Sequence, residues 1–135
     1  MKEFEKLSDT KKPALNVRAT TRVGLVTAAL QGMFTFVIPQ KVSEEKIERA
    51  FSVEATDSAN LLANILDFAL ASATKNNEVY DNVRFTLITD KKAEGNFIGK
   101  SAESFTTKIK ALTRQDLKVE KNLIGEWETT LVFDV

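Results

Sequence analysis

The sequence predicts an α+β fold in which two helices pack on a mixed or largely antiparallel sheet. Several segments alternate apolar and polar residues, as half-buried strands do, and two segments carry apolar residues at helical spacing. The predicted strands come in runs, whereas a doubly wound parallel sheet would alternate strand and helix regularly. A chain of 135 residues, 43% of them hydrophobic, is expected to form a single domain that spans residues 1–135.

The first part of the chain is predicted to contain a strand, a helix and a second strand. Residues 15–20 alternate in polarity and are predicted to form a strand after a turn at residues 11–13. A helix is predicted to begin at residue 20 or 21, where either threonine can cap it, and to end at Pro39. Residues 47–55 alternate again and are predicted to form the next strand.

A second helix is predicted over residues 59–74, capped by Asp57 or Ser58 and ended by the asparagines at 76 and 77. Because apolar residues cover most of its circumference, we expect it to be the central helix and more buried than the first. Its narrow polar stripe has two interpretations, the solvated edge of a core helix or one wall of a functional groove. The stripe consists of Asn60, Asn64, Asp67 and Ala71.

Residues 83–99 are predicted to form a hairpin that turns at residues 90–95. The run from Gly95 to Ser101 is similar to a phosphate-binding loop, but it is one residue too short and no apolar helical pattern follows it. A strand that contains glycines is the better interpretation. Further on, a strand face is expected to present basic residues that are either solvated or in contact with RNA. These residues are Lys108, Lys110 and Arg114.

The segment from residue 108 to the end is predicted to form two alternating strands, and the alternation is clearest over residues 126–135. Asp134 stands there between Phe133 and Val135, beside the predicted core. Burying an unpaired carboxylate costs several kcal/mol. Asp134 is therefore expected to be solvated at the strand end, paired with a cation, or used to hold a metal.

The composition narrows the possible functions. Lysine plus arginine and aspartate plus glutamate both number 19, so the net charge is zero and no strong direct binding of nucleic acid is expected. The chain has no cysteine and no histidine, which excludes disulfides, thiol catalysis and the usual general base near neutral pH. The first twelve residues are too polar for a secretory signal, and no apolar run approaches the roughly 18 residues that span a bilayer. The sequence thus predicts a cytoplasmic protein without a membrane partner.

The C-terminal part of the chain resembles the archease family, small proteins that assist the RtcB-type RNA ligase. The resemblance rests on residues 109–113, on residues 117–120, on Trp127 and on the final residues 133–135. At the other end, residues 4–10 are similar to the segment that leads into the family's His-Thr-Ala-Asp motif.

That motif is interrupted in this chain. With Thr10 placed on the family's threonine, Asp9 stands where the family has histidine and Lys12 stands where it has the metal-binding aspartate. Pro13 and Ala14 form a small insertion.

The resemblance implies a fold of linked strand-helix-strand-strand units and an accessory role without catalysis. Family members bind a divalent metal, such as calcium or magnesium, through aspartates and promote ligase guanylylation and turnover in tRNA splicing or RNA repair. The metal ligands implied here are Asp134 and Asp9, with Lys12 in place of the third acid. A divergent, metal-free archease-fold binding module with another protein partner is the alternative. A third hypothesis is an enzyme that uses Asp9, Asp67 or Asp134 as acid or base.

Two placements of Lys12 follow from the interrupted motif. In one, the ammonium approaches the Asp134 carboxylate and supplies the positive charge that a metal supplies in other members of the family. In the other, the insertion of Pro13 and Ala14 moves Lys12 into solvent and Asp134 is only hydrated at the end of the chain.

Overall fold

The computed structural model describes residues 2–8 and 10–135, and within them the chain forms two helices and ten strands. The helices are α1 (Arg22–Phe34) and α2 (Ser58–Asn76). The strands are β1 (Lys2–Lys6), β2 (Ala14–Ala19), β3 (Ile38–Gln40), β4 (Lys46–Glu54), β5 (Glu78–Ile88), β6 (Lys92–Ser101), β7 (Ser104–Thr107), β8 (Ala111–Leu112), β9 (Glu120–Lys121) and β10 (Trp127–Asp134).

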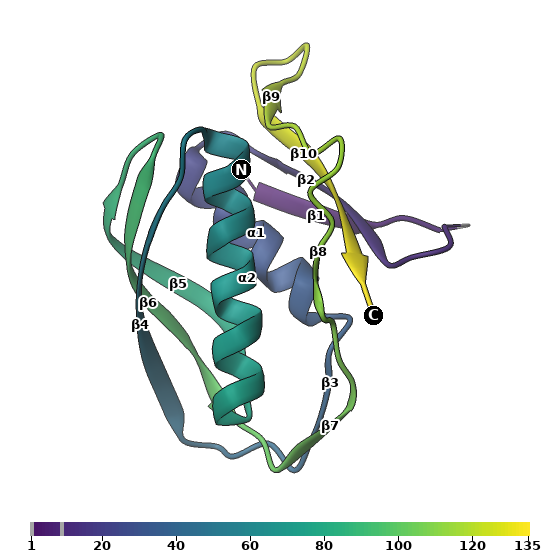
Figure 1. Ribbon diagram of the computed structural model, residues 1–135, viewed down its shortest axis with the longest axis vertical. Coiled ribbons are helices and arrows are strands. Elements are labelled where there is room, and N and C mark those ends of the chain that lie inside the picture. Colours follow the sequence, from purple (N-terminus) through teal and green to yellow (C-terminus); the bar gives the residue numbers. More distant parts are fainter. Residues whose placement is uncertain (1, 9) are drawn as a thin grey trace.

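The two helices lie between two antiparallel sheets (Figure 1). One sheet has three strands in the order β4-β6-β5, and the other has the order β1-β2-β10-β8 with β9 paired to β10. A short ladder of β3 and β7 connects them at one end. Helix α1 packs against β1, β2 and β5, and α2 packs against β4, β5, β6 and β8. The predicted α+β class is therefore confirmed, and the described strand pairs are all antiparallel. The prediction of one sheet is wrong, because the strands divide into two main sheets and a short ladder.

Helix α1 begins where the sequence predicts but ends earlier. The Thr21 hydroxyl accepts a hydrogen bond from the Gly24 amide at 3.0 Å, as expected of an N-cap. The helix ends at Phe34 instead of continuing to Pro39. Because a residue before proline favours an extended backbone, Ile38 joins the short strand β3 and pairs with β7.

The prediction that the second helix is the more buried one is wrong. Eight of the 13 residues of α1 are buried, compared with eight of the 19 residues of α2. Helix α1 fits between the two sheets because it is built largely from small residues. At Gly32, for example, a Cβ atom would lie only 2.7 Å from Leu15 Cδ1 of β2. Helix α2 leaves one side open, and Phe68 on that side is 37% exposed.

The ends of α2 agree with the sequence. The Asp57 carboxylate accepts a hydrogen bond from the Asn60 amide at 2.8 Å, which holds the pKa of Asp57 below its usual value. At the other end, Asn77 caps the helix with φ 55°, in the left-handed region that asparagine tolerates better than most residues.

The glycine-rich run of residues 95–101 is a strand, as predicted, and not a phosphate-binding loop. It lies within β6, between β4 and β5, and the hairpin turn is shorter than expected because the two strands extend to Ile88 and Lys92. A Cβ atom at Gly99 would overlap the carbonyl oxygen of Val79, and one at Gly95 would overlap that of Arg84. Both glycines therefore permit a close approach of the β5 backbone.

The C-terminal prediction is half right. Strand β10 has the expected alternation, with Thr129, Leu131 and Phe133 buried on one face. The preceding segment forms only the two-residue strands β8 and β9, so its basic residues do not share one strand face. Leu112 and Arg114 of this segment bond to side chains of α2, and no local pattern reveals these contacts.

The buried side chains of both sheets and both helices form one continuous core. The largest fully buried side chains are Tyr80, Phe97, Phe133, Leu15, Leu30, Met33, Ile65, Leu66, Leu131 and Val17. In the part of the chain that the structure describes, no helix combines the length and the apolar character needed to cross a membrane.

Candidate functional site

The Lys12 ammonium donates a hydrogen bond to Asp134 Oδ1 at 2.6 Å and forms an ion pair with it. Asp134 ends β10, and Lys12 lies two residues before β2, the strand beside β10. The Lys12 and Asp134 side chains are 51% and 43% exposed. The first of the two placements of Lys12 is therefore the observed one, and the pair lies at the surface.

The backbone explains why the insertion does not move Lys12 away from Asp134. The Phe133 amide donates to the Pro13 carbonyl at 2.9 Å, and Ala14 is already the first residue of β2. The Thr10 hydroxyl donates to the Lys12 carbonyl at 2.7 Å, which closes the loop on itself. The inserted residues thus extend the ladder between β2 and β10 and bring Lys12 to the end of β10.

Two further residues approach Asp134. The Thr113 hydroxyl donates to Asp134 Oδ2 at 3.3 Å, and the Lys110 amide donates to the Asp134 carbonyl at 2.8 Å. The hydrogen bond from Lys12 is the largest cause that lowers the pKa of Asp134, with smaller contributions from Thr113 and from the Lys110 charge. Asp134 is therefore a carboxylate that is held in its ionised form.

The residues present do not fit a divalent metal at this position. Calcium or magnesium requires several oxygen ligands, but one Asp134 oxygen is in contact with an ammonium group. Among residues 2–8 and 10–135, no group of three or more acidic side chains could hold a metal ion. Asp9, the other metal ligand implied by the resemblance, lies outside the described residues.

The polar stripe of α2 is partly exposed, and three of its side chains also bind Arg114. The Arg114 guanidinium donates to Asn64 Oδ1 at 2.7 Å, to Asp67 Oδ2 at 2.8 Å and to Asn60 Oδ1 at 3.3 Å. Asp67 Oδ1 also accepts from the Leu112 amide at 3.1 Å. These contacts fasten the segment that carries Thr113 to α2.

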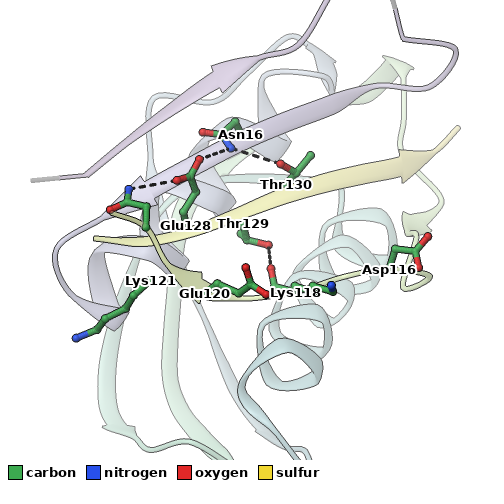
Figure 2. Close-up of a pocket in the computed structure, with 9 residues that line it drawn as sticks. Asn16, Asp116, Lys118, Glu120, Lys121, Glu128, Thr129 and Thr130 are labelled. Carbon is green, nitrogen blue, oxygen red and sulfur yellow. Dashed lines mark hydrogen bonds between the residues drawn. The ribbon is translucent and has the colours of Figure 1, made fainter. Parts of the chain in front are cut away.

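A polar groove of about 310 Å³ lies beside β2 and β10, and the sequence analysis did not identify it (Figure 2). The Asn16 amide group donates to Glu128 Oε2 at 2.9 Å, and this bond is the main cause that lowers the pKa of Glu128. The Thr129 hydroxyl donates to the Lys118 carbonyl at 2.6 Å, which holds the opposite wall. The lining residues are Asn16, Asp116, Lys118, Glu120, Lys121, Asn122, Glu128, Thr129 and Thr130.

Next to the groove, the turn between β9 and β10 carries two exposed aliphatic side chains. Leu123 is 105% exposed and Ile124 is 79% exposed. The Asn122 carboxamide oxygen accepts from the amides of Ile124 at 3.1 Å and Glu126 at 3.0 Å, and these bonds stabilise the turn.

An ion pair that no sequence pattern indicates joins β4 and β5, between the buried Glu78 and the partly exposed Arg49. The Arg49 guanidinium binds the Glu78 carboxylate through both oxygens, at 2.8 Å each, and the Glu78 side chain is only 3% exposed. The Tyr80 hydroxyl donates to the same carboxylate at 2.8 Å, and burial raises the pKa of Tyr80 well above its usual value. These bonds compensate the buried charge of Glu78 within the core.

Together these features define a small α+β protein with two helices between antiparallel sheets and an exposed ion pair where β10 ends. The model of the Archease protein family (MTH1598/TM1083) matches residues 4–135, and the chain belongs to this family.

Two solved structures show the same fold. An archease from Thermotoga maritima, described as a possible chaperone, is 18% identical, with a TM-score of 0.65 over 97% of this chain and 96% of that one. Protein 1598 of Methanobacterium thermoautotrophicum is 17% identical, with a TM-score of 0.67 over 99% of this chain and 98% of that one. No curated protein matches the chain.

Proposed function

We propose that this protein is an accessory protein of an RtcB-type RNA ligase and promotes its guanylylation and turnover. The observation that carries the proposal is the family match, which extends over residues 4–135 and so includes almost the whole chain. The description of the Thermotoga maritima relative as a possible chaperone agrees with a helper role.

The chemistry of the chain supports a helper and not an independent enzyme. A nucleophile needs an adjacent base, and the chain has neither histidine nor cysteine. Two of the three aspartates considered as acid or base are paired with cations, Asp67 with Arg114 and Asp134 with Lys12. The exposed Leu123 and Ile124 offer apolar contact to a partner protein.

A multiple-turnover ligation assay with the cognate ligase tests this proposal. The protein should have little activity alone and should raise the turnover rate of the ligase when added in stoichiometric amounts. Asp134→Arg should reduce this stimulation if the end of β10 faces the ligase. Glu45→Arg makes the same change of charge at an exposed position before β4 and should keep the stimulation. No change of rate with the wild-type protein would contradict the proposal.

The second candidate is an archease-fold binding module with a different protein partner. The contact between Lys12 and Asp134 favours it, because a site with an ammonium in place of an acid differs from that expected of the family. Affinity purification of the tagged protein from its own cells separates the candidates. Recovery of the ligase supports the accessory role, and reproducible recovery of another protein without the ligase supports the module.

A further inference from the structure

At the end of β10, the Asp134 carboxylate pairs with the ammonium group of Lys12, a residue in a loop that is bonded to β10 through Pro13. We propose that the Lys12 ammonium occupies the position of a metal ion beside Asp134, so that no divalent ion binds at this site. The resemblance to the archease motif places Lys12 at the position of a metal-binding aspartate, and the structure places its ammonium 2.6 Å from Asp134 Oδ1.

The position of Lys12 is set by the fold and not only by attraction between two mobile side chains. Its loop is anchored on one side by the bond from the Phe133 amide to the Pro13 carbonyl. It is closed on the other side by the bond from the Thr10 hydroxyl to the Lys12 carbonyl. Phe133 precedes Asp134, so the backbone bond that anchors the loop is adjacent to the residue that carries the carboxylate.

A lysine in place of the aspartate disfavours the binding of a divalent ion in two ways. A divalent ion loses one carboxylate ligand, and it meets the positive charge of Lys12 at the remaining one. Lys110 adds a second positive charge in the surroundings of Asp134. The second Asp134 oxygen accepts from Thr113, so both oxygens already have partners.

Isothermal titration with calcium chloride tests the inference on the intact chain. The wild-type protein should give no heat of binding that depends on Asp134. Lys12→Asp removes the ammonium and restores the acid, and it should create a weak calcium site with a dissociation constant on the order of 10⁻³ M or better. Circular dichroism confirms that each variant is folded, and the exposed position of Lys12 favours folding.

Two control variants separate a specific site from general attraction. Lys11→Asp makes the same change of net charge in the same loop, at an exposed residue, and should gain no binding. The double variant Lys12→Asp with Asp134→Asn should lose the gained site.

Two results would overturn the inference. One is calcium binding by the wild-type protein that Asp134→Asn abolishes, because Lys12 would then not exclude the ion. The other is a folded Lys12→Asp variant that binds no better than Lys11→Asp, because Lys12 would then not occupy a metal position.

Discussion

Asp134 shows how one charged residue is accommodated at the end of an apolar strand. Its neighbour Phe133 is fully buried, whereas the Asp134 side chain is 43% exposed and contacts Lys12 and Thr113. An ion pair at this exposure contributes little to the free energy of unfolding, because water screens it.

Replacing Lys12 by glutamine should raise the pKa of Asp134 toward its usual value. The pKa of Asp134 is lowered in the folded protein, so the pair stabilises the fold above the unfolded pKa, about 3.9. This stabilisation is lost as the pH falls through the pKa of the folded state. In the same pH range, the free energy of unfolding of the Lys12→Gln variant should therefore depend less on pH. Titration of the Asp134 carboxyl by nuclear magnetic resonance measures the change. Lys11→Gln should leave the pKa of Asp134 unchanged. Equal pKa values of Asp134 in the Lys12→Gln and Lys11→Gln variants would contradict the contact between Lys12 and Asp134.

Strand β6 shows how the packing of a sheet can require glycine at particular positions. It is the central strand of its sheet, and the register of β5 against it shifts at two places, between Tyr80 and Asn82 and between Phe85 and Leu87. Gly99 and Gly95 lie opposite Tyr80 and Phe85, where these shifts begin, and the β5 backbone comes closest there. The glycines that suggested a phosphate-binding loop therefore serve the packing of the sheet.

Gly99→Ala should destabilise the protein by about 1–3 kcal/mol or more, as overpacking of a rigid site does. The added methyl group would overlap the Val79 carbonyl, and backbone cannot move aside as a flexible side chain can. Lys100→Ala, the next residue on the same strand, has a side chain that is 43% exposed and should cost far less. Urea unfolding of both variants checks this difference. Equal midpoints of unfolding would show that the β5 backbone does not lie so close to Gly99.

The whole molecule is built around two helices that share one core between two sheets. Helix α1 contacts both sheets, while α2 covers the three-stranded sheet and holds the C-terminal segment through Arg114. This arrangement places the end of β10, the polar groove and the exposed turn on the sheet that contains both β2 and β10. The core thus supports a surface on which these sites are fixed relative to one another.

Leu66→Ala tests the packing of α2 in the hydrophobic core. Leu66 is fully buried, and its truncation should lower the free energy of unfolding by about 2–5 kcal/mol through the cavity that it leaves. Leu123→Ala makes the same chemical change at a side chain that is fully exposed and should alter stability by no more than about 0.5 kcal/mol. Thermal unfolding compares the two, and a Leu66→Ala variant that melts like wild type would contradict the core assignment.

Features that depend on neighbouring residues could be predicted from the sequence. The alternation of β4 and β10, the capping residues Thr21 and Asp57, and the α+β class follow from patterns a few residues long. These patterns are reliable because a strand repeats every second residue and a cap bonds an amide three residues away. The sequence also indicates that Asp134 needs a partner or solvent, since it is a carboxylate within an apolar strand, and Lys12 is the observed partner.

Features that depend on distant partners required the folded chain. The contact of Arg114 with α2 joins residues 47 to 54 positions apart, and only residues 111–112 of the predicted strand form a strand, β8. The burial of α1 also depends on a second sheet, whose strands come from both ends of the chain. The sequence left two placements of Lys12 open, and the backbone bond between Pro13 and Phe133 selects one of them. Local patterns are silent about such pairs, because their energy arises only when the chain brings the partners together.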